Sequence, residues 1–535
     1  MAAFAHLDLQ VLVVEDSNFF RTAITGMLSS LGISKVDGVP SGNMAIELCQ
    51  HRHFDLILCD QNLGKGKNGQ QTLEALRHIN MIKDNTAFMM ISGDPSRQTV
   101  LASSDVCADD FLSKPLNTSM LQKRIGRLLS LKRAFKPVFA ALNNSEFETA
   151  IERLQVLAEE GQRFASLANK LLGETLLQVR RIDEAEQHYR QQLQTGPLEW
   201  ARLGLAFVYQ MRGDIAESTE LFNAIIADNP HCLAAYDGLA TNHHKTYDFL
   251  RLQQTLEKAV RVSPLSILRQ KNLANMAEQN GDIPTALKAL RECVRLGFHS
   301  CHGDWNDAYR FGMNTADAPQ ALIDEQDKLP QEALNILKTA TEYFNVSPDE
   351  LLRMQFLRGR LQFLARQIHD GKSAIYRAES QYALNESKDI ATDIARVKAM
   401  HTIHEHEKAD QLSQDLTRQY AKDQEALNQL DQVLNEPVSQ QNRNVLAEAN
   451  KKGIALYNQK KYDEALLCFE RARVLFPRHI GIQLNICQAY IGKRNLNADS
   501  ELDKVIEDLL GHIQKLIKNS DPQYGRFIKL RNLAG

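Results

Sequence analysis

The chain of 535 residues lacks several features that mark common protein classes. Its eight cysteines form no CxxC pair, which argues against a disulfide framework and common zinc motifs. The N-terminus has no cationic flank before an apolar run, and no stretch approaches the roughly 18 apolar residues of a membrane span. Lys and Arg number 63 against 66 Asp and Glu, without the basic excess of nucleic-acid binders. We therefore expect a cytoplasmic protein that neither inserts into membranes nor binds nucleic acid.

The first quarter of the chain alternates short apolar runs with amphipathic segments. The apolar runs predict five strands, at residues 10–14, 35–39, 56–59, 87–91 and 109–112. The segments that follow them predict helices at residues 18–31, 41–51, 70–81, 96–103 and 119–129. Such alternation is typical of a doubly wound α/β domain with a five-stranded parallel sheet. We expect this domain to occupy residues 1–130.

Three acids and one lysine stand at the ends of separate predicted strands. Glu15 and Asp16 follow the first strand, Asp60 ends the third, and Lys114 follows the fifth. The carboxyl ends of parallel strands meet in one crevice, so these side chains should share a site. Acids that close cannot all stay ionised without a cation, and an oxygen-only cluster suits Mg²⁺. The pattern predicts a Mg²⁺-dependent phosphoryl acceptor.

These residues belong to a longer pattern. It comprises Glu15-Asp16 with Arg21, Asp60 with Asn62, Ser92-Gly93, and the run Ala-Asp-Asp-Phe-Leu-Ser-Lys-Pro at residues 108–115. The pattern resembles the receiver domain of bacterial two-component response regulators. By that resemblance, Asp60 accepts phosphate from a histidine kinase or phosphotransfer protein, and Lys114 pairs with the phosphoryl group. The resemblance also assigns Mg²⁺ to Glu15, Asp16, Asp60 and the backbone carbonyl of Asn62, with Ser92 as the hydroxyl switch and Phe111 as the aromatic switch.

The sequence departs from that family in two places. The loop at residues 63–69 is about one residue longer than usual and carries Lys65 and Lys67. These lysines could guide a phosphodonor, but we favour a solvated basic loop. Phe111 stands where tyrosine is commoner, so its movement cannot depend on a phenolic hydrogen bond.

The rest of the chain lacks strand signals and shows a period of 34 residues. Pro230 and Pro264 are 34 residues apart, and Gly213 and Gly281 differ by 68, which is twice that period. The period indicates tetratricopeptide repeats, which stack helix pairs into a solenoid. We predict such repeats over residues 131–298.

The pattern is weaker over residues 299–370, where we expect irregular helices that continue the repeats. His299, Cys301 and His302 in this region could suggest a metal site. Their spacing is tight and no second ligand cluster accompanies them, so we favour a plain loop.

Residues 372–436 contain neither glycine nor proline. A narrow apolar stripe predicts one long helix, a helical hairpin or a coiled coil over residues 371–436, with a break near Asn385 as an alternative. His401 and His404 could share a metal, but without a visible third ligand we interpret them as partly buried or surface histidines. A further tetratricopeptide repeat and a capping helix are expected over residues 440–535.

These features favour a response regulator that is not an enzyme and whose output is protein binding. Its partners would be the phosphodonor protein and an unidentified protein held in the repeat groove, with a homodimer possible. The alternative is a constitutive scaffold whose receiver domain serves only for docking or dimerisation. A third hypothesis, an active site within residues 298–370, lacks any acid–base or nucleophile signature.

Overall fold

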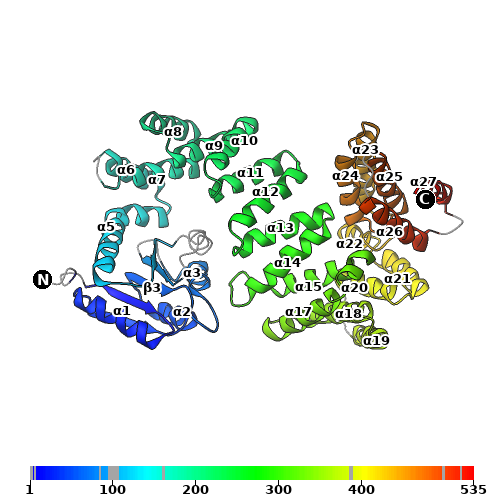
Figure 1. Cartoon of the computed structure of the whole chain (residues 1–535), viewed down its shortest axis with the longest axis horizontal. Coiled ribbons are helices and arrows are strands. Elements are labelled where there is room, and N and C mark those ends of the chain that lie inside the picture. The colour runs from blue at the N-terminus through cyan, green and yellow to red at the C-terminus, as the bar shows by residue number, and fades with distance from the viewer. Residues whose placement is uncertain are drawn as a thin grey trace. The chain divides into compact units, whose positions relative to one another are not determined.

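The computed structural model describes residue 4 and residues 8–82, 86–93, 108–159, 163–384, 389–496, 500–517 and 521–534. Figure 1 shows the ribbon coloured from the N-terminus in blue to the C-terminus in red. The chain forms two compact units. Unit 1 comprises residues 1–270 and 296–303, and unit 2 comprises residues 271–295 and 304–535. No helix among the described residues is long and apolar enough to cross a membrane.

Unit 1 begins with the predicted five-stranded parallel sheet. Its strands are β1 (Gln10–Val14), β2 (Lys35–Val39), β3 (Leu56–Asp60), β4 (Ala87–Ser92) and β5 (Asp110–Ser113). Their order is β2-β1-β3-β4-β5, and every neighbouring pair is parallel. Every residue of β3 and β4 is buried. Continuous burial explains their unbroken apolar sequence, because helices cover both faces of the sheet.

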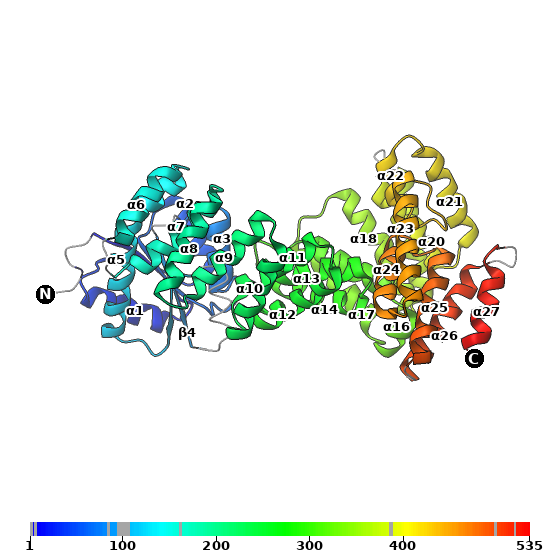
Figure 2. The same ribbon diagram turned by 90° about the horizontal axis from the view of Figure 1, so that it is seen from above.

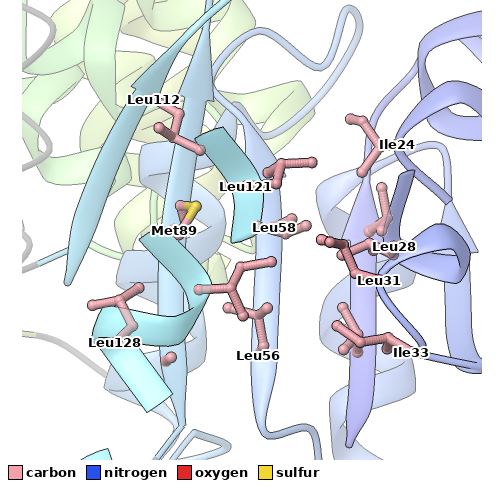
Figure 3. Close-up of a cluster of buried hydrophobic side chains, with 14 of the residues drawn as sticks. Ile24, Leu28, Leu31, Ile33, Leu56, Leu58, Met89, Leu112, Leu121 and Leu128 are labelled. Carbon is pink, nitrogen blue, oxygen red and sulfur yellow. The ribbon is translucent and has the colours of Figure 1, made fainter. Parts of the chain in front are cut away.

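Two pairs of helices cover the sheet. Helices α1 (Asn18–Ser30) and α5 (Thr118–Asn143) pack on one face, where Leu28 and Leu121 meet Leu58 in a buried cluster (Figure 3). Helices α2 (Gly42–His51) and α3 (Gly69–His78) pack on the other. The helix predicted at residues 96–103 lies outside the described residues.

Helix α5 is much longer than the predicted segment of residues 119–129. It passes through Pro137 and ends at Asn143, so residue 130, where we expected a domain to end, lies inside it. The Lys132 ammonium, in the middle of α5, pairs with the Asp109 carboxylate at 2.7 Å. That carboxylate also accepts the backbone N–H of Phe88 in β4, at 2.8 Å. An ion pair and a hydrogen bond therefore connect the middle of α5 to the sheet.

The helices that follow in unit 1 repeat one packing contact. They are α6 (Phe147–Glu159), α7 (Ala165–Gln178), α8 (Ile182–Thr195), α9 (Glu199–Arg212), α10 (Ile215–Asp228), α11 (Leu233–Lys245) and α12 (Phe249–Val262). The Tyr189 ring of α8 lies so close to α7 and α9 that a Cβ at Gly173 or Gly204 would approach it to 2.5 or 2.2 Å. One repeat later, the Phe222 ring of α10 approaches Gly238 of α11 to 2.2 Å in the same way. The alternation of an aromatic ring with glycine accounts for the 34-residue period.

Two helices contain residues of both units, namely α13 (Ile267–Asn280) and α14 (Ile283–Gly297). Unit 2 continues with α15 (Trp305–Ala316), α16 (Gln320–Glu325), α17 (Leu329–Tyr343) and α18 (Pro348–Leu364). It ends with α23 (Gln440–Asn458), α24 (Tyr462–Leu475), α25 (Ile480–Leu496), α26 (Ser500–Leu516) and α27 (Tyr524–Ala534), coloured orange to red in Figure 2. Phe469 of α24 lies against Gly453 of α23 at 2.4 Å from a Cβ position, as in the earlier repeats.

Residues 371–436 form four helices instead of one long helix. These are α19 (Ile368–Leu384), α20 (Ile390–Thr402), α21 (His406–Gln419) and α22 (Gln424–Leu430). Side-chain caps start two of them, because Asp389 accepts the N–H of Thr392 and Asp423 accepts that of Ala426. His404 adopts a left-handed backbone conformation with φ of 66° and separates α20 from α21. The expected break near Asn385 falls at residues 385–388, outside the described part of the chain.

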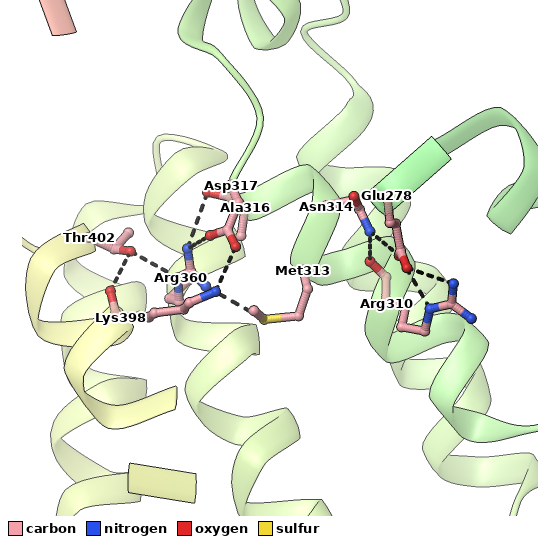
Figure 4. Close-up of polar contacts among 9 residues, drawn as sticks. All are labelled: Glu278, Arg310, Met313, Asn314, Ala316, Asp317, Arg360, Lys398 and Thr402. Atoms are coloured by element: carbon pink, nitrogen blue, oxygen red, sulfur yellow. Dashed lines mark hydrogen bonds and ion pairs between the residues drawn. The ribbon is translucent and has the colours of Figure 1, made fainter. Parts of the chain in front are cut away.

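Buried polar contacts connect the helices of unit 2 (Figure 4). The Arg360 side chain on α18, which is only 6% exposed, pairs with Asp317 after α15 and donates to Thr402 Oγ1 on α20 at 2.9 Å. Lys398 of α20 pairs with the same Asp317 carboxylate at 2.9 Å. Burial raises the pKa of this carboxyl, but Lys398 and Arg360 lower it further, so the pKa lies below its usual value. Asp317 is therefore ionised and shared by two cations.

Candidate functional site

The sheet ends in an open cleft of about 610 Å³ where the acids were expected to meet. Its lining residues follow the carboxyl ends of the strands, and they are Glu15, Asp16, Ser17, Phe20, Asp60, Gln61, Asn62, Asn68, Ser92, Gly93 and Lys114. The fold thus brings together all but one of the site residues predicted from the sequence. Phe111 is the exception, since it packs against the apolar cluster on the α2–α3 face.

Lys114 lies at the centre of the charge pattern. Its Nζ pairs with Glu15 Oε2 at 2.8 Å and with Asp60 Oδ2 at 3.0 Å. Glu15 and Asp60 are nearly buried, with 2% and 5% of their surface exposed, whereas Asp16 is exposed. The Lys114 ammonium also lies over the Phe20 ring, 4.7 Å from its centre. Two buried carboxylates therefore share one cation that an aromatic ring also stabilises.

Burial sets the electrostatics of the site. It raises the pKa of Asp60 above the ordinary value of an aspartate, although the hydrogen bond and charge of Lys114 act in the opposite direction. The pKa of Glu15 is raised for the same reason, with the neighbouring Asp60 charge adding to the effect. One lysine does not fully compensate these acids, so the site favours a further cation.

The available oxygen atoms fit Mg²⁺. Glu15, Asp16 and Asp60 each offer a carboxylate oxygen, and these atoms lie within 4.8 Å of one another. Asp60 Oδ1 is buried and accepts no hydrogen bond from any residue that the structure describes. Oxygen ligands with room for water suit this ion. The donor set is therefore compatible with the predicted Mg²⁺ site.

Arg21 positions the acidic turn. Its guanidinium donates to the Glu15 carbonyl at 2.6 Å and to the Asp16 carbonyl at 3.4 Å. The same side chain donates to the Asn18 amide oxygen at 2.9 Å, which joins the turn to the start of α1. The sequence showed the Arg21 spacing, but its positioning role follows only from these contacts.

Two glycines allow the loop after β3 to approach the acids. Gly64 has a φ of +68°, and a Cβ there would lie 3.0 Å from Asp16 Oδ2. A Cβ at Gly69 would meet the Asp60 carbonyl at 2.4 Å. Asn68 then starts α3 by accepting the N–H of Gln71 at 2.8 Å. The longer loop therefore still closes over the cleft.

Ser92 and Phe111 lie on neighbouring strands. Ser92 ends β4, is 3% exposed, and its carbonyl accepts the N–H of Lys114 at 2.8 Å. Phe111 in β5 pairs in register with Met90 of β4 and is partly buried. The switch roles implied for these two residues stay predictions.

Two residues near the cleft were not understood from the sequence. Phe20 received no role, and only its position beside Lys114 shows its importance. Lys67 was expected to be solvated, but it is partly buried and donates to the His299 carbonyl in unit 1. Burial lowers its pKa below that of an exposed lysine. No local signal could reveal a partner 232 residues away.

Comparisons with known proteins agree with this geometry. The family model of the response regulator receiver domain matches residues 11–126, and that of the tetratricopeptide repeat matches residues 447–479. The Regulator of RpoS of Escherichia coli (strain K12) is 30% identical over 189 residues, which are 34% of this chain and 50% of that protein. The cell cycle transcriptional regulator CtrA of Caulobacter vibrioides is 30% identical over 117 residues, covering 22% of this chain and 48% of that protein.

The chain thus spans about half the length of these curated relatives. Among solved structures, the chemotaxis protein CheY4 of Vibrio cholerae is 28% identical with a TM-score of 0.22, covering 23% of this chain and 98% of that one.

Proposed function

For a chain that joins a response regulator receiver domain to a tetratricopeptide repeat, we propose a phosphorelay function with protein binding as its output. Asp60 would accept a phosphoryl group from a histidine kinase or phosphotransfer protein in the cytoplasm. The observation that carries this proposal is the Asp60 carboxylate itself, with Oδ2 held by Lys114 and Oδ1 buried without a partner among the described residues.

The residues of the cleft divide the chemistry. Glu15, Asp16, Asp60 and the backbone carbonyl of Asn62 would hold Mg²⁺, which supplies positive charge opposite the phosphoryl oxygens. An Asp60 oxygen forms the new bond to phosphorus as the bond to the donor nitrogen breaks. Lys114 then pairs with the transferred group and compensates the charge that Asp60 gains.

Ser92 and Phe111 would carry the change away from the site. The Ser92 hydroxyl can donate to a phosphoryl oxygen, which moves the end of β4. Phe111, on the neighbouring strand, would then change its packing and alter the surface formed by β5 and α5. Because α5 continues into the helical repeats, a movement there reaches the partner-binding region.

The repeats would bind a protein partner, since stacked helix pairs present a concave surface that suits a peptide or helix. The fold gives no partner identity. The helical region would have no catalytic role of its own.

The alternative is a constitutive scaffold in which the receiver domain only docks or dimerises. One observation favours it, because the Gln71 side chain on α3 donates to the carbonyls of Leu296 and Phe298, both at 3.2 Å. This contact joins the receiver domain to a distant part of unit 1 without any phosphoryl group.

Labelling followed by a binding assay tests the proposal. With acetyl phosphate and Mg²⁺, the intact mass should rise by about 80 Da, the mass of one phosphoryl group. Asp60→Asn should gain none, whereas Asp37→Asn, which changes an acid on β2 far from the cleft, should be labelled normally. Labelling of Asp60→Asn would refute the assignment. Partner capture that is equal with phosphorylated and unphosphorylated protein would favour the scaffold.

A further inference from the structure

Three soft ligand residues meet in unit 1, away from the acidic cleft. His78 ends α3, while Cys301 and His302 lie just after α14. One ligand atom from each lies within 4.8 Å of the other two. The His78 and His302 rings are 5.6 Å apart between centres, and Cys301 is a free, partly buried thiol. The sequence showed only Cys301 and His302, because His78 is distant along the chain.

The backbone beside this cluster is already held in place. Lys67 donates to the His299 carbonyl, and Gln71 donates to the carbonyls of Leu296 and Phe298. These donors come from the start of α3 and its preceding loop, and His78 is the last residue of the same helix. The segment and the helix therefore meet at two places, of which the second is the His and Cys cluster.

The turn that carries Cys301 and His302 is also closely packed. A Cβ at Gly303 would lie 2.0 Å from the Gly297 carbonyl, so only glycine fits there. The Ser300 hydroxyl accepts the N–H of His302 at 3.1 Å. Two ligands are thus presented from a compact turn.

We propose that His78, Cys301 and His302 bind one Zn²⁺ ion, with water as the fourth ligand. A thiolate and two imidazoles suit this borderline-soft metal, whereas Mg²⁺ prefers oxygen. Tetrahedral bonds of about 2.0–2.3 Å place ligand atoms roughly 3.3–3.8 Å apart, so the three side chains need to close by about 1 Å. The Cys301 thiol releases its proton to solvent as the sulfur–zinc bond forms.

Bound zinc would connect α3 of the receiver domain to residues 296–303 by metal–ligand bonds. This inference goes beyond the proposed phosphorelay function, because it concerns another metal, other ligands and another face of the domain. The site and Asp60 can therefore be tested separately.

Cobalt provides the direct test, because a cobalt–thiolate bond absorbs light. The full-length protein is freed of metal with a chelator, Mg²⁺ is added in excess to fill the acidic cleft, and Co²⁺ is titrated. We expect one equivalent to produce a thiolate-to-cobalt charge-transfer band with the spectrum of tetrahedral Co²⁺, and Zn²⁺ to abolish it. Absence of this band from the parent protein overturns the proposal.

Matched variants identify the ligands. Cys301→Ser should lose the band, and His78→Ala should weaken binding by on the order of 100-fold. Cys468→Ser, which changes another partly exposed cysteine, and His53→Ala, which changes an exposed histidine, should bind Co²⁺ as the parent does. A band that survives in Cys301→Ser, or is lost equally in Cys468→Ser, refutes the site.

Hydrogen exchange gives an independent readout. Zn²⁺ should slow exchange in residues 296–303 and at the end of α3 in the parent protein, and should have no such effect in Cys301→Ser. Phosphoryl labelling of Asp60 should be normal in Cys301→Ser, which also shows that this variant is folded. Equal protection by Zn²⁺ in both proteins would contradict binding at Cys301.

Discussion

Asp60 lies in a position that is unfavourable to its own charge. Burial raises its pKa, and Glu15 beside it is raised for the same reason. An acid whose pKa is higher in the folded state stabilises that state at low pH, and this contribution disappears as the pH rises through the folded-state pKa. Without Mg²⁺, the ionised cluster should therefore destabilise the domain at neutral pH.

This predicts a stabilising effect of Asp60→Asn in Mg²⁺-free protein. At pH 7 the variant should unfold at a higher urea concentration than the parent, by about 1 kcal/mol or more. The difference should shrink as the pH falls towards about 4, where the parent's acids become protonated. Asp37→Asn is the control, since Asp37 forms a surface pair with Arg52. A parent protein more stable than Asp60→Asn at pH 7 would mean that Lys114 fully compensates the acid.

The placement of the acids was predictable from the sequence because each follows a recognisable strand. Glu15, Asp60 and Lys114 follow runs whose apolar character comes from burial on both faces of a sheet. The contacts of Lys67 and His78 were not predictable, because their partners lie more than 200 residues away and the loop sequence does not encode them. Sequence periodicity shows which face of an element is buried, but not which distant segment covers it.

At the scale of elements, glycines against aromatic rings determine how closely the repeat helices approach. A methyl group on Gly204 would lie 2.2 Å from the Tyr189 ring, which is itself buried between helices. We predict that Gly204→Ala destabilises the α8–α9 pair by about 1–3 kcal/mol, as overpacked cores generally do.

Hydrogen exchange in α8 and α9 measures this effect, because the whole chain is too large for two-state analysis. Gly26→Ala in α1 is the control, since a Cβ there has nothing within 4 Å. That change should stabilise α1 by about 1 kcal/mol or less through helix propensity. Unchanged exchange in Gly204→Ala would show that the ring can move away at little cost.

Helix α5 should transmit the receiver's state because nothing interrupts it between Thr118 and Asn143. We predict that phosphorylation changes hydrogen exchange in residues 92–129 and also in the first repeats, up to about residue 197. A flexible Gly-Ser insert near Leu131 should preserve labelling of Asp60 and abolish the change in the repeats. An Ala-rich helical insert of equal length is the control for added residues. Repeats that respond fully despite the flexible insert would mean that coupling follows another contact.

Helix ends were less predictable than helix identity. Pro137 usually ends a helix but here lies inside one, and the segment without glycine or proline at residues 372–436 is nonetheless broken. The breaks come from aspartate caps such as Asp389 and Asp423, whose side chains bond backbone N–H groups. A caps-based interpretation would have favoured short helices there.

At the scale of the whole molecule, the two units should respond separately to mutation. Arg360→Met removes one cation from the Asp317 carboxylate and leaves Thr402 without its donor. We predict a loss of about 2–4 kcal/mol in unit 2, because a buried charge pair is broken. Hydrogen exchange should rise in α15, α18 and α20.

Phosphoryl labelling of Asp60 should be unaffected by Arg360→Met, since the two residues belong to different units. Arg418→Met serves as the control because Arg418 forms only an exposed pair with Asp415. Exchange that rises equally with both substitutions would show that the buried network contributes no more than a surface pair.

Helix α5 also restricts how such a chain can be recombined. Leu121 and Leu128 belong to the core under the sheet, whereas Phe135 and Val138, further along the same helix, belong to the core of the first repeats. Each inserted or deleted residue would turn the second set of side chains by about 100° relative to the first. Exchanging the receiver domain for another during evolution would therefore require the join to keep the helical phase, and changes of junction length close to whole turns should be tolerated best.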